Sequence, residues 1–209
     1  MAVYDLKDQE EIENFKHFWH SWGRWAFAAL LAAALGYLGW VLNQNHQSSQ
    51  SSAAVSLFDD WALKHQANQH AQAAEVLTQL QSQYPATVST AQATLIQAGY
   101  AFEQGKYDEA SGHYNWVLTY QKEPLIRALA IQRLAIVQLQ QKQYDAALAT
   151  LQQPVDDAFA AQILETRGDV YSAQGKTEEA VAAYQEALGK LPEEDPAREI
   201  LKLKAEQAI

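Results

Sequence analysis

Cysteine is absent from the 209 residues of the chain. Its absence excludes structural disulfides, thiolate metal sites and lipid attachment through an N-terminal cysteine. A chain without cysteine is compatible with an oxidising compartment without requiring one.

Positive charge is also scarce, with 15 Lys and Arg residues against 25 Asp and Glu and a net charge of −10. A protein that binds nucleic acid presents a basic patch, and none is visible in the sequence. Catalytic signatures are lacking too: there is no nucleophile elbow, phosphate-binding glycine loop, metal-ligand cluster or Cys/His pair. We therefore expect no nucleic-acid partner, small-molecule substrate, cofactor, metal or catalytic activity.

The chain does have one long apolar stretch, residues 25–42 (WAFAALLAAALGYLGWVL), with no charge, Asn, Gln or Pro. As a helix this stretch would span roughly 27 Å, close to the hydrocarbon core of a bilayer. Aromatic residues at both of its ends are typical of membrane interfaces, whereas a buried core helix is seldom apolar all round. We predict a transmembrane helix that contacts membrane lipid.

The leader, residues 1–24, is acidic, and the apolar run after it is too long for the core of a cleaved signal peptide. We therefore expect an uncleaved anchor. Apolar residues recur in the leader at helical spacing, which predicts a cytoplasmic or interfacial helix. The sequence leaves open whether this helix lies on the membrane or continues the span.

Basic residues near the span predict its orientation. Lys7, Lys16 and Arg24 precede it, and the first Lys or Arg after it is Lys64. Because Lys and Arg accumulate on the cytoplasmic side, we expect a cytoplasmic N-terminus and an extracytoplasmic chain after residue 43.

Small residues recur every four places along the span, at Ala28, Ala32 and Gly36. Small side chains allow another transmembrane helix to approach closely, so we expect a helix contact on this face. The alternative is an alanine-rich span without a dedicated partner.

Beyond the span, residues 43–53 are polar and predict a linker or a frayed helix end. From residue 54 onward the pattern is helical and repetitive. Small residues recur in pairs, and four places after the second small residue of each pair stands a large residue. The three sets are Ala98, Ala110 and Tyr114; Ala135, Ala147 and Leu151; and Gly168, Ala180 and Tyr184. Two helices of a hairpin pack closely where neither side chain is bulky, so the pattern predicts stacked helical hairpins. We expect Asp108, Asp145 and Thr177 to be the N-caps of the second helices.

These residues resemble the tetratricopeptide repeat. The last unit matches the spacing of that repeat at Leu164, Gly168, Tyr171, Ala180, Tyr184, Ala187 and Pro192. The resemblance implies an all-α fold: one N-terminal transmembrane helix, then a tetratricopeptide-like solenoid over residues 54–209. We expect repeat units at residues 55–85, 91–124, 128–154 and 161–192, and a capping helix at residues 196–208.

Helical solenoids usually bind through a concave surface lined by the first helix of each pair. The predicted surface residues are Leu95, Phe102, Gln132, Ile136, Glu165 and Asp169. Tetratricopeptide proteins that clamp acidic C-termini use Lys, Arg and Asn at such places, and none stands here. Phe102 and Ile136 therefore fit an extended, apolar chain, or else they pack against the neighbouring repeat; the sequence does not separate the two.

The whole layout resembles the YfgM family, the ancillary subunit of the bacterial SecYEG translocon. The resemblance lies in an acidic leader with Tyr4, an aromatic approach to the membrane at residues 15–19 (FKHFW), a single span, a polar linker from Asn45 to Ser49, and a short repeat domain. It implies a single-pass inner-membrane protein with a periplasmic domain. The implied partners are the SecYEG translocon and a PpiD-type periplasmic chaperone, and the implied role is to assist maturation of translocated proteins. An inner-membrane scaffold for envelope or cell-division assembly, without a role in secretion, is the alternative.

Overall fold

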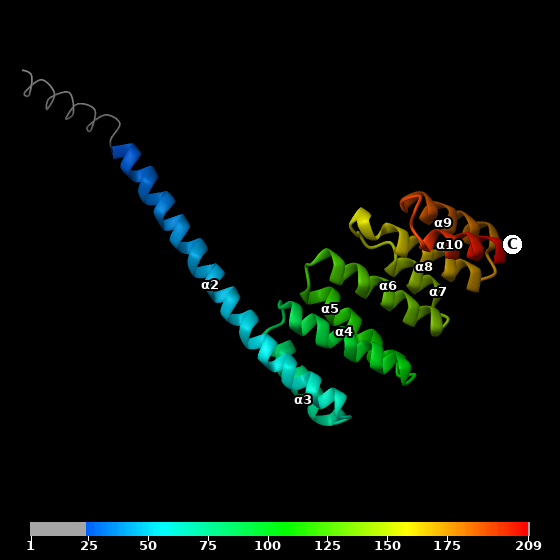
Figure 1. The fold of residues 1–209 in the computed structure, drawn as a ribbon, viewed down its shortest axis with the longest axis horizontal. Helices are drawn as coiled ribbons and strands as arrows, with labels where there is room; N and C mark the ends of the chain where they lie inside the picture. The colour runs from blue at the N-terminus through cyan, green and yellow to red at the C-terminus, as the bar shows by residue number, and fades with distance from the viewer. Residues whose placement is uncertain (1–23, 209) are drawn as a thin grey trace, which may run out of the picture. The chain divides into compact units, whose positions relative to one another are not determined.

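The computed structural model describes residues 24–208, and every regular element in that range is a helix (Figure 1). The predicted helix in the leader therefore lies outside the described residues, apart from Arg24. The elements are α2 (Arg24–Gln66), α3 (His70–Gln83), α4 (Val88–Glu103), α5 (Tyr107–Tyr120), α6 (Pro124–Gln140), α7 (Tyr144–Thr150), η2 (Asp157–Phe159), α8 (Ala160–Ala173), α9 (Thr177–Lys190) and α10 (Ala197–Gln207). The expected all-α fold class is confirmed.

The first part of α2 carries the apolar stretch. Within the described chain, α2 is the helix long and apolar enough to cross a membrane. Every side chain from residue 25 to residue 42 is exposed, which excludes the alternative of a buried core helix. The segment 43–53, predicted as a linker or frayed end, is helical instead, since no Gly or Pro interrupts it and Ser and Gln tolerate helical geometry. Contacts divide the chain into two compact units, with the boundary between Gln50 and Ser51.

The second unit is a stack of antiparallel helix pairs. The last turns of α2 pack with α3 around the buried Trp61, and α4 pairs with α5, α6 with α7, and α8 with α9. Neighbouring pairs contact through α4 and α6, through α5 and α6, and through α6 and α8, and α10 packs on α9 at the C-terminal end (Figure 1). The first helices α4, α6 and α8 therefore follow one another in the stack.

The predicted small residues lie where the helices of each pair cross. Ala98, Ala110, Ala135, Ala147 and Ala180 are each 0% exposed. Gly168 shows why size matters there, because a Cβ added to it would come within 2.4 Å of the Tyr184 ring. The repeat pattern thus reflects close helix crossings, as the sequence predicts.

The predicted N-caps are wrong. Helices α5, α7 and α9 begin at Tyr107, Tyr144 and Thr177, so their N-caps are Lys106, Gln143 and Lys176, without side-chain capping bonds. Each preceding turn ends at a residue with positive φ, so the next helix begins earlier in the sequence than predicted. These residues are Gly105 at 71°, Lys142 at 60° and Gly175 at 74°. Asp108 and Asp145 fall in the first helical turn, where a negative charge still favours the helix dipole.

Candidate functional site

Five of the six predicted surface residues separate into two regions of the repeat domain. Leu95, Phe102 and Ile136 line a hollow between α4 and α6. Glu165 and Asp169, on α8, are instead bound to Lys204 of the C-terminal helix. We call the first region the α4–α6 hollow and the second, made of Glu165, Asp169, Tyr184 and Lys204, the capped face.

The α4–α6 hollow is open and mainly apolar. It has a volume of about 470 Å³ and is lined by Leu95, Ile96, Gly99, Phe102, Glu103, Tyr114, Leu129, Arg133 and Ile136. The α4 residues share one helix face, as do the α6 residues, because they recur at intervals of three or four. Ile96 and Leu129 are 41% and 36% exposed, so the hollow presents apolar side chains to solvent.

The floor of the hollow is the core of the α4–α5–α6 packing. Ala98, Ala101 and Leu134 are buried there, and Leu95 and Phe102 pack against this cluster at their inner edges. Phe102 also contacts Tyr107, with ring centroids 5.4 Å apart. Phe102 therefore does both things that the sequence left open: it packs against its neighbours and also lines an accessible hollow.

Three polar side chains lie among these apolar ones. Among residues 24–208, the side chains of Arg133 and Glu103 make no hydrogen bond or ion pair, and the Tyr114 hydroxyl has no hydrogen-bond partner. Burial raises the pKa of Tyr114, and the charge of Arg133 opposes that rise. Tyr114 and Arg133 line the same hollow, and the positive charge of Arg133 favours the ionised form of the Tyr114 phenol.

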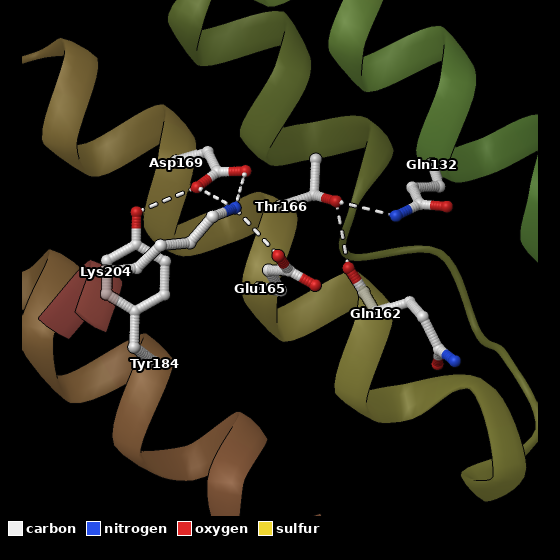
Figure 2. Close-up of polar contacts among 7 residues, drawn as sticks. All are labelled: Gln132, Gln162, Glu165, Thr166, Asp169, Tyr184 and Lys204. Carbon is white, nitrogen blue, oxygen red and sulfur yellow. Dashed lines mark hydrogen bonds and ion pairs between the residues drawn. The ribbon is translucent and has the colours of Figure 1, made fainter. Parts of the chain in front are cut away.

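The capped face, in contrast to the open apolar hollow, is made of polar and charged side chains that bind one another (Figure 2). Lys204 reaches from α10 and donates to Glu165 Oε1 at 2.7 Å and to Asp169 Oδ1 and Oδ2 at 2.8 and 2.9 Å. The Tyr184 hydroxyl donates to Asp169 Oδ1 at 2.8 Å. Both carboxylates are therefore bound within the domain, and the single positive charge of Lys204 balances one of their two negative charges.

The proton affinities of the capped face reflect this network. Burial works to lower the pKa of Lys204, but hydrogen bonds and charges from Asp169 and Glu165 outweigh it and raise the pKa above 10.5. Burial, followed by the hydrogen bond to Asp169, raises the pKa of Tyr184. Lys204 and Tyr184 consequently keep their protons, and the contacts that depend on those protons, at neutral pH.

Gln132 also belongs to a polar contact rather than to the hollow. Its Nε2 donates to Thr166 Oγ1 at 3.2 Å, and the Thr166 hydroxyl donates to the backbone carbonyl of Gln162 at 2.9 Å (Figure 2). This chain links α6 to α8. Gln132 thus has a structural partner, unlike its neighbour Arg133.

Sequence reasoning missed Leu129 and Arg133, which line the hollow, and Lys204, which covers the acidic residues of the capped face. Leu129 and Arg133 lie on the α6 face that also carries Ile136, at helical spacing, so a search along that face would have found them. Lys204 follows the buried Leu201 by three positions, which places it on the packed side of α10. Nothing in the sequence states that it pairs with α8.

The predicted contact face of the span lies within α2. Ala28, Ala32 and Gly36 are exposed, and a Cβ added to Gly36 would meet nothing within 4 Å. Spaced by four, they lie along one side of the helix. The contact of this face with another transmembrane helix stays a prediction.

Comparison with known proteins places the chain in a family. The family described as a tetratricopeptide repeat-like domain matches residues 16–208. The "Ancillary SecYEG translocon subunit" of Neisseria gonorrhoeae is 47% identical over 164 residues, which cover 77% of this chain and 78% of that protein. The protein of the same description from Haemophilus influenzae is 28% identical over 144 residues, covering 69% and 70% of the two chains. Because the family model covers residues 16–208 and the Neisseria protein is 47% identical over most of both chains, the chain belongs to the tetratricopeptide repeat-like family of ancillary SecYEG translocon subunits, the YfgM family.

Proposed function

We propose that this protein is a non-enzymatic, single-pass subunit associated with the SecYEG translocon in the bacterial inner membrane. The observation that carries the proposal is the 47% identity, over most of both chains, to a protein described as an ancillary subunit of that translocon. The exposed apolar part of α2 is its membrane anchor and contacts lipid. The small-residue face of α2, at Ala28, Ala32 and Gly36, is the side on which a translocon helix would pack.

In this proposal the N-terminus is cytoplasmic and the repeat domain is periplasmic. The support is the distribution of basic residues, since Lys7, Lys16 and Arg24 precede the span and Lys64 is the first to follow it. The repeat domain then holds a PpiD-type periplasmic chaperone near the translocon and so assists the maturation of translocated proteins. The α4–α6 hollow is the docking surface, because it combines exposed apolar side chains with polar groups that have no partner within the described chain.

Reporter fusions test the orientation. Alkaline phosphatase fused to the C-terminus is expected to be active, and a fluorescent protein that folds only in the cytoplasm is expected to be dark. The reverse pattern would overturn the periplasmic placement of the domain.

Co-purification from membranes tests the translocon contact. Gly36→Leu adds bulk to the small-residue face and is expected to lower the yield of translocon while keeping the chaperone. Ala34→Leu adds bulk on the opposite side of α2, because two residues rotate by about 200° along a helix, and it is the matched control. Equal translocon yields from wild type and Gly36→Leu would show that this face makes no such contact.

A further inference from the structure

We propose that the α4–α6 hollow receives an apolar segment of a partner protein that carries a carboxylate, and that Arg133 and Tyr114 bind this carboxylate. The inference rests on the proposed function, since it names the chemistry of the segment that docks in the hollow. The apolar walls of the hollow favour apolar segments in general, and Arg133 and Tyr114 select among them those that carry a carboxylate.

Tyr114 is 3% exposed and lines the hollow, and comparison between repeats shows that its hydroxyl lacks the acceptor that its counterpart has. Ala98 and Gly168 occupy the same place in their repeats, which makes Tyr114 equivalent to Tyr184. The Tyr184 hydroxyl donates to Asp169 at 2.8 Å. The position equivalent to Asp169 is Gly99, which has no side chain to accept a bond and itself lines the hollow. A carboxylate from a partner would supply the acceptor that the chain itself supplies in the last repeat.

Arg133 is the cation for that carboxylate. It lines the hollow, and among residues 24–208 it makes no hydrogen bond or ion pair. The other arginines of the repeat domain, Arg127, Arg167 and Arg198, each donate to a backbone carbonyl. Because the Arg133 guanidinium and the Tyr114 phenol line the same hollow, both can donate to one carboxylate there, and hydrogen bonds with an ionised partner are the stronger kind.

The remaining charge of the hollow, Glu103, limits where the carboxylate lies. Ala98 and Ala135 stand at the same level in their repeats, so Glu103 lies about 10 Å further along the helix direction than Arg133. A carboxylate near Arg133 is thus separated from Glu103, whereas one at the other end of the hollow would be repelled by it. The segment therefore docks with its acidic group at the Arg133 end.

Peptide binding to the full chain in lipid nanodiscs tests the inference. The probe is a fluorescent heptapeptide of Leu, Phe and Ala with blocked ends and a central Asp, and its matched control has Asn in place of Asp. Binding to empty nanodiscs is subtracted. We expect the Asp peptide to bind about three- to tenfold more tightly than the Asn peptide, with the difference shrinking as salt is raised.

The variants assign the difference to named groups. Arg133→Gln is expected to abolish the preference for Asp, Tyr114→Phe to reduce it, and Glu103→Gln to strengthen binding of the Asp peptide slightly. Circular dichroism melting of each variant checks that the domain stays folded. Equal binding of both peptides to wild type, no binding of either, or a preference that survives Arg133→Gln would overturn the inference.

The outcome also distinguishes this inference from the proposed function. In one outcome, Leu129→Asp abolishes co-purification of the chaperone, but the wild-type protein binds the Asp and Asn peptides equally tightly, as Arg133→Gln does. Docking in the hollow then stands and the carboxylate inference fails. If Leu129→Asp leaves the chaperone in place but the Asp preference depends on Arg133, the hollow binds acidic apolar segments and the chaperone docks elsewhere.

Discussion

The α4–α6 hollow and the capped face are built on equivalent first helices of the repeats, α4 and α8, yet one is open and the other is covered. Leu95 and Gly99 in the first region stand where Glu165 and Asp169 stand in the second. The acidic pair is covered by Lys204, whose helix ends the solenoid. The apolar positions have no such cover within the described chain. The same scaffold thus covers one surface with its own C-terminal helix and leaves the other open to solvent.

The largest expected effect on the stability of the protein comes from the packing of Gly168 against Tyr184, beneath the capped face. Gly168→Ala places a Cβ within 2.4 Å of the Tyr184 ring, and overpacking of this kind costs about 1–3 kcal/mol. Gly99→Ala is the matched control, because a Cβ there meets nothing within 4 Å and alanine favours a helix by about 0.5–1 kcal/mol. Urea unfolding of the full chain in nanodiscs, followed by pulse proteolysis, measures both.

The two glycines are expected to shift stability in opposite directions. Gly168→Ala should lower the urea midpoint and Gly99→Ala should leave it unchanged or raise it. Equal shifts in the two variants would mean that the hollow is packed as tightly as the last repeat, and the contrast between the regions would be lost.

A smaller effect is expected from the cap itself. Lys204→Met leaves the half-buried Glu165 and Asp169 without their cation, at a cost of about 1–2 kcal/mol. The fraying of α10 would appear as faster amide hydrogen exchange in that helix. Lys202→Met is the control, because its partner Glu199 is exposed and such pairs contribute little. A Lys204→Met protein with unchanged exchange in α10 would show that packing of Leu201 alone holds the cap.

The smallest expected effect is a difference in acid sensitivity. Burial lowers the pKa of His65 below 6.5, and His70 lowers it further; burial also lowers the pKa of His113, although Glu109 partly opposes this. The unfolded chain then binds more protons than the folded one, so stability is full above pH 6.5 and declines as pH falls through the folded-state pKa.

Neither α8, α9 nor α10 contains a histidine, so the loss should be confined to the first half of the repeat domain. Hydrogen-exchange protection factors at about pH 7.5 and about pH 5.5 compare α4–α5 with α8–α9, which can open separately in a solenoid. Substituting His65 and His113 by Gln should flatten the pH dependence of the first half. An equal loss of protection in α8–α9 would contradict this assignment.

The sequence predicted the parts of the fold that repeat. The spacing of Ala98, Ala110 and Tyr114 recurs because each hairpin crosses in the same way, and a recurring physical constraint leaves a visible pattern. The N-caps were mispredicted because each turn ends at a residue with positive φ, so the next helix begins earlier than the predicted caps. Glycine signals that conformation at positions 105 and 175, whereas no local signal reveals it at Lys142.

The candidate site was predictable only in part. Leu95, Phe102 and Ile136 were found because their helix faces follow from the repeat register. Glu165 and Asp169 were expected to be on the same surface, but a residue far along the chain, Lys204, occupies them. Such pairing between α8 and α10 depends on tertiary packing, which spacing alone does not encode.

The most direct test of the account compares two exposed leucines of the repeat domain. Leu129 lines the α4–α6 hollow at 36% exposure, and Leu203 lies on α10 at 53% exposure. Full chains with Leu129→Asp or Leu203→Asp are purified from cells, and their yields of chaperone and translocon are compared with wild type. The account predicts that Leu129→Asp loses the chaperone and keeps the translocon, while Leu203→Asp keeps both. Retention of the chaperone by Leu129→Asp, or equal loss in the two variants, would contradict it.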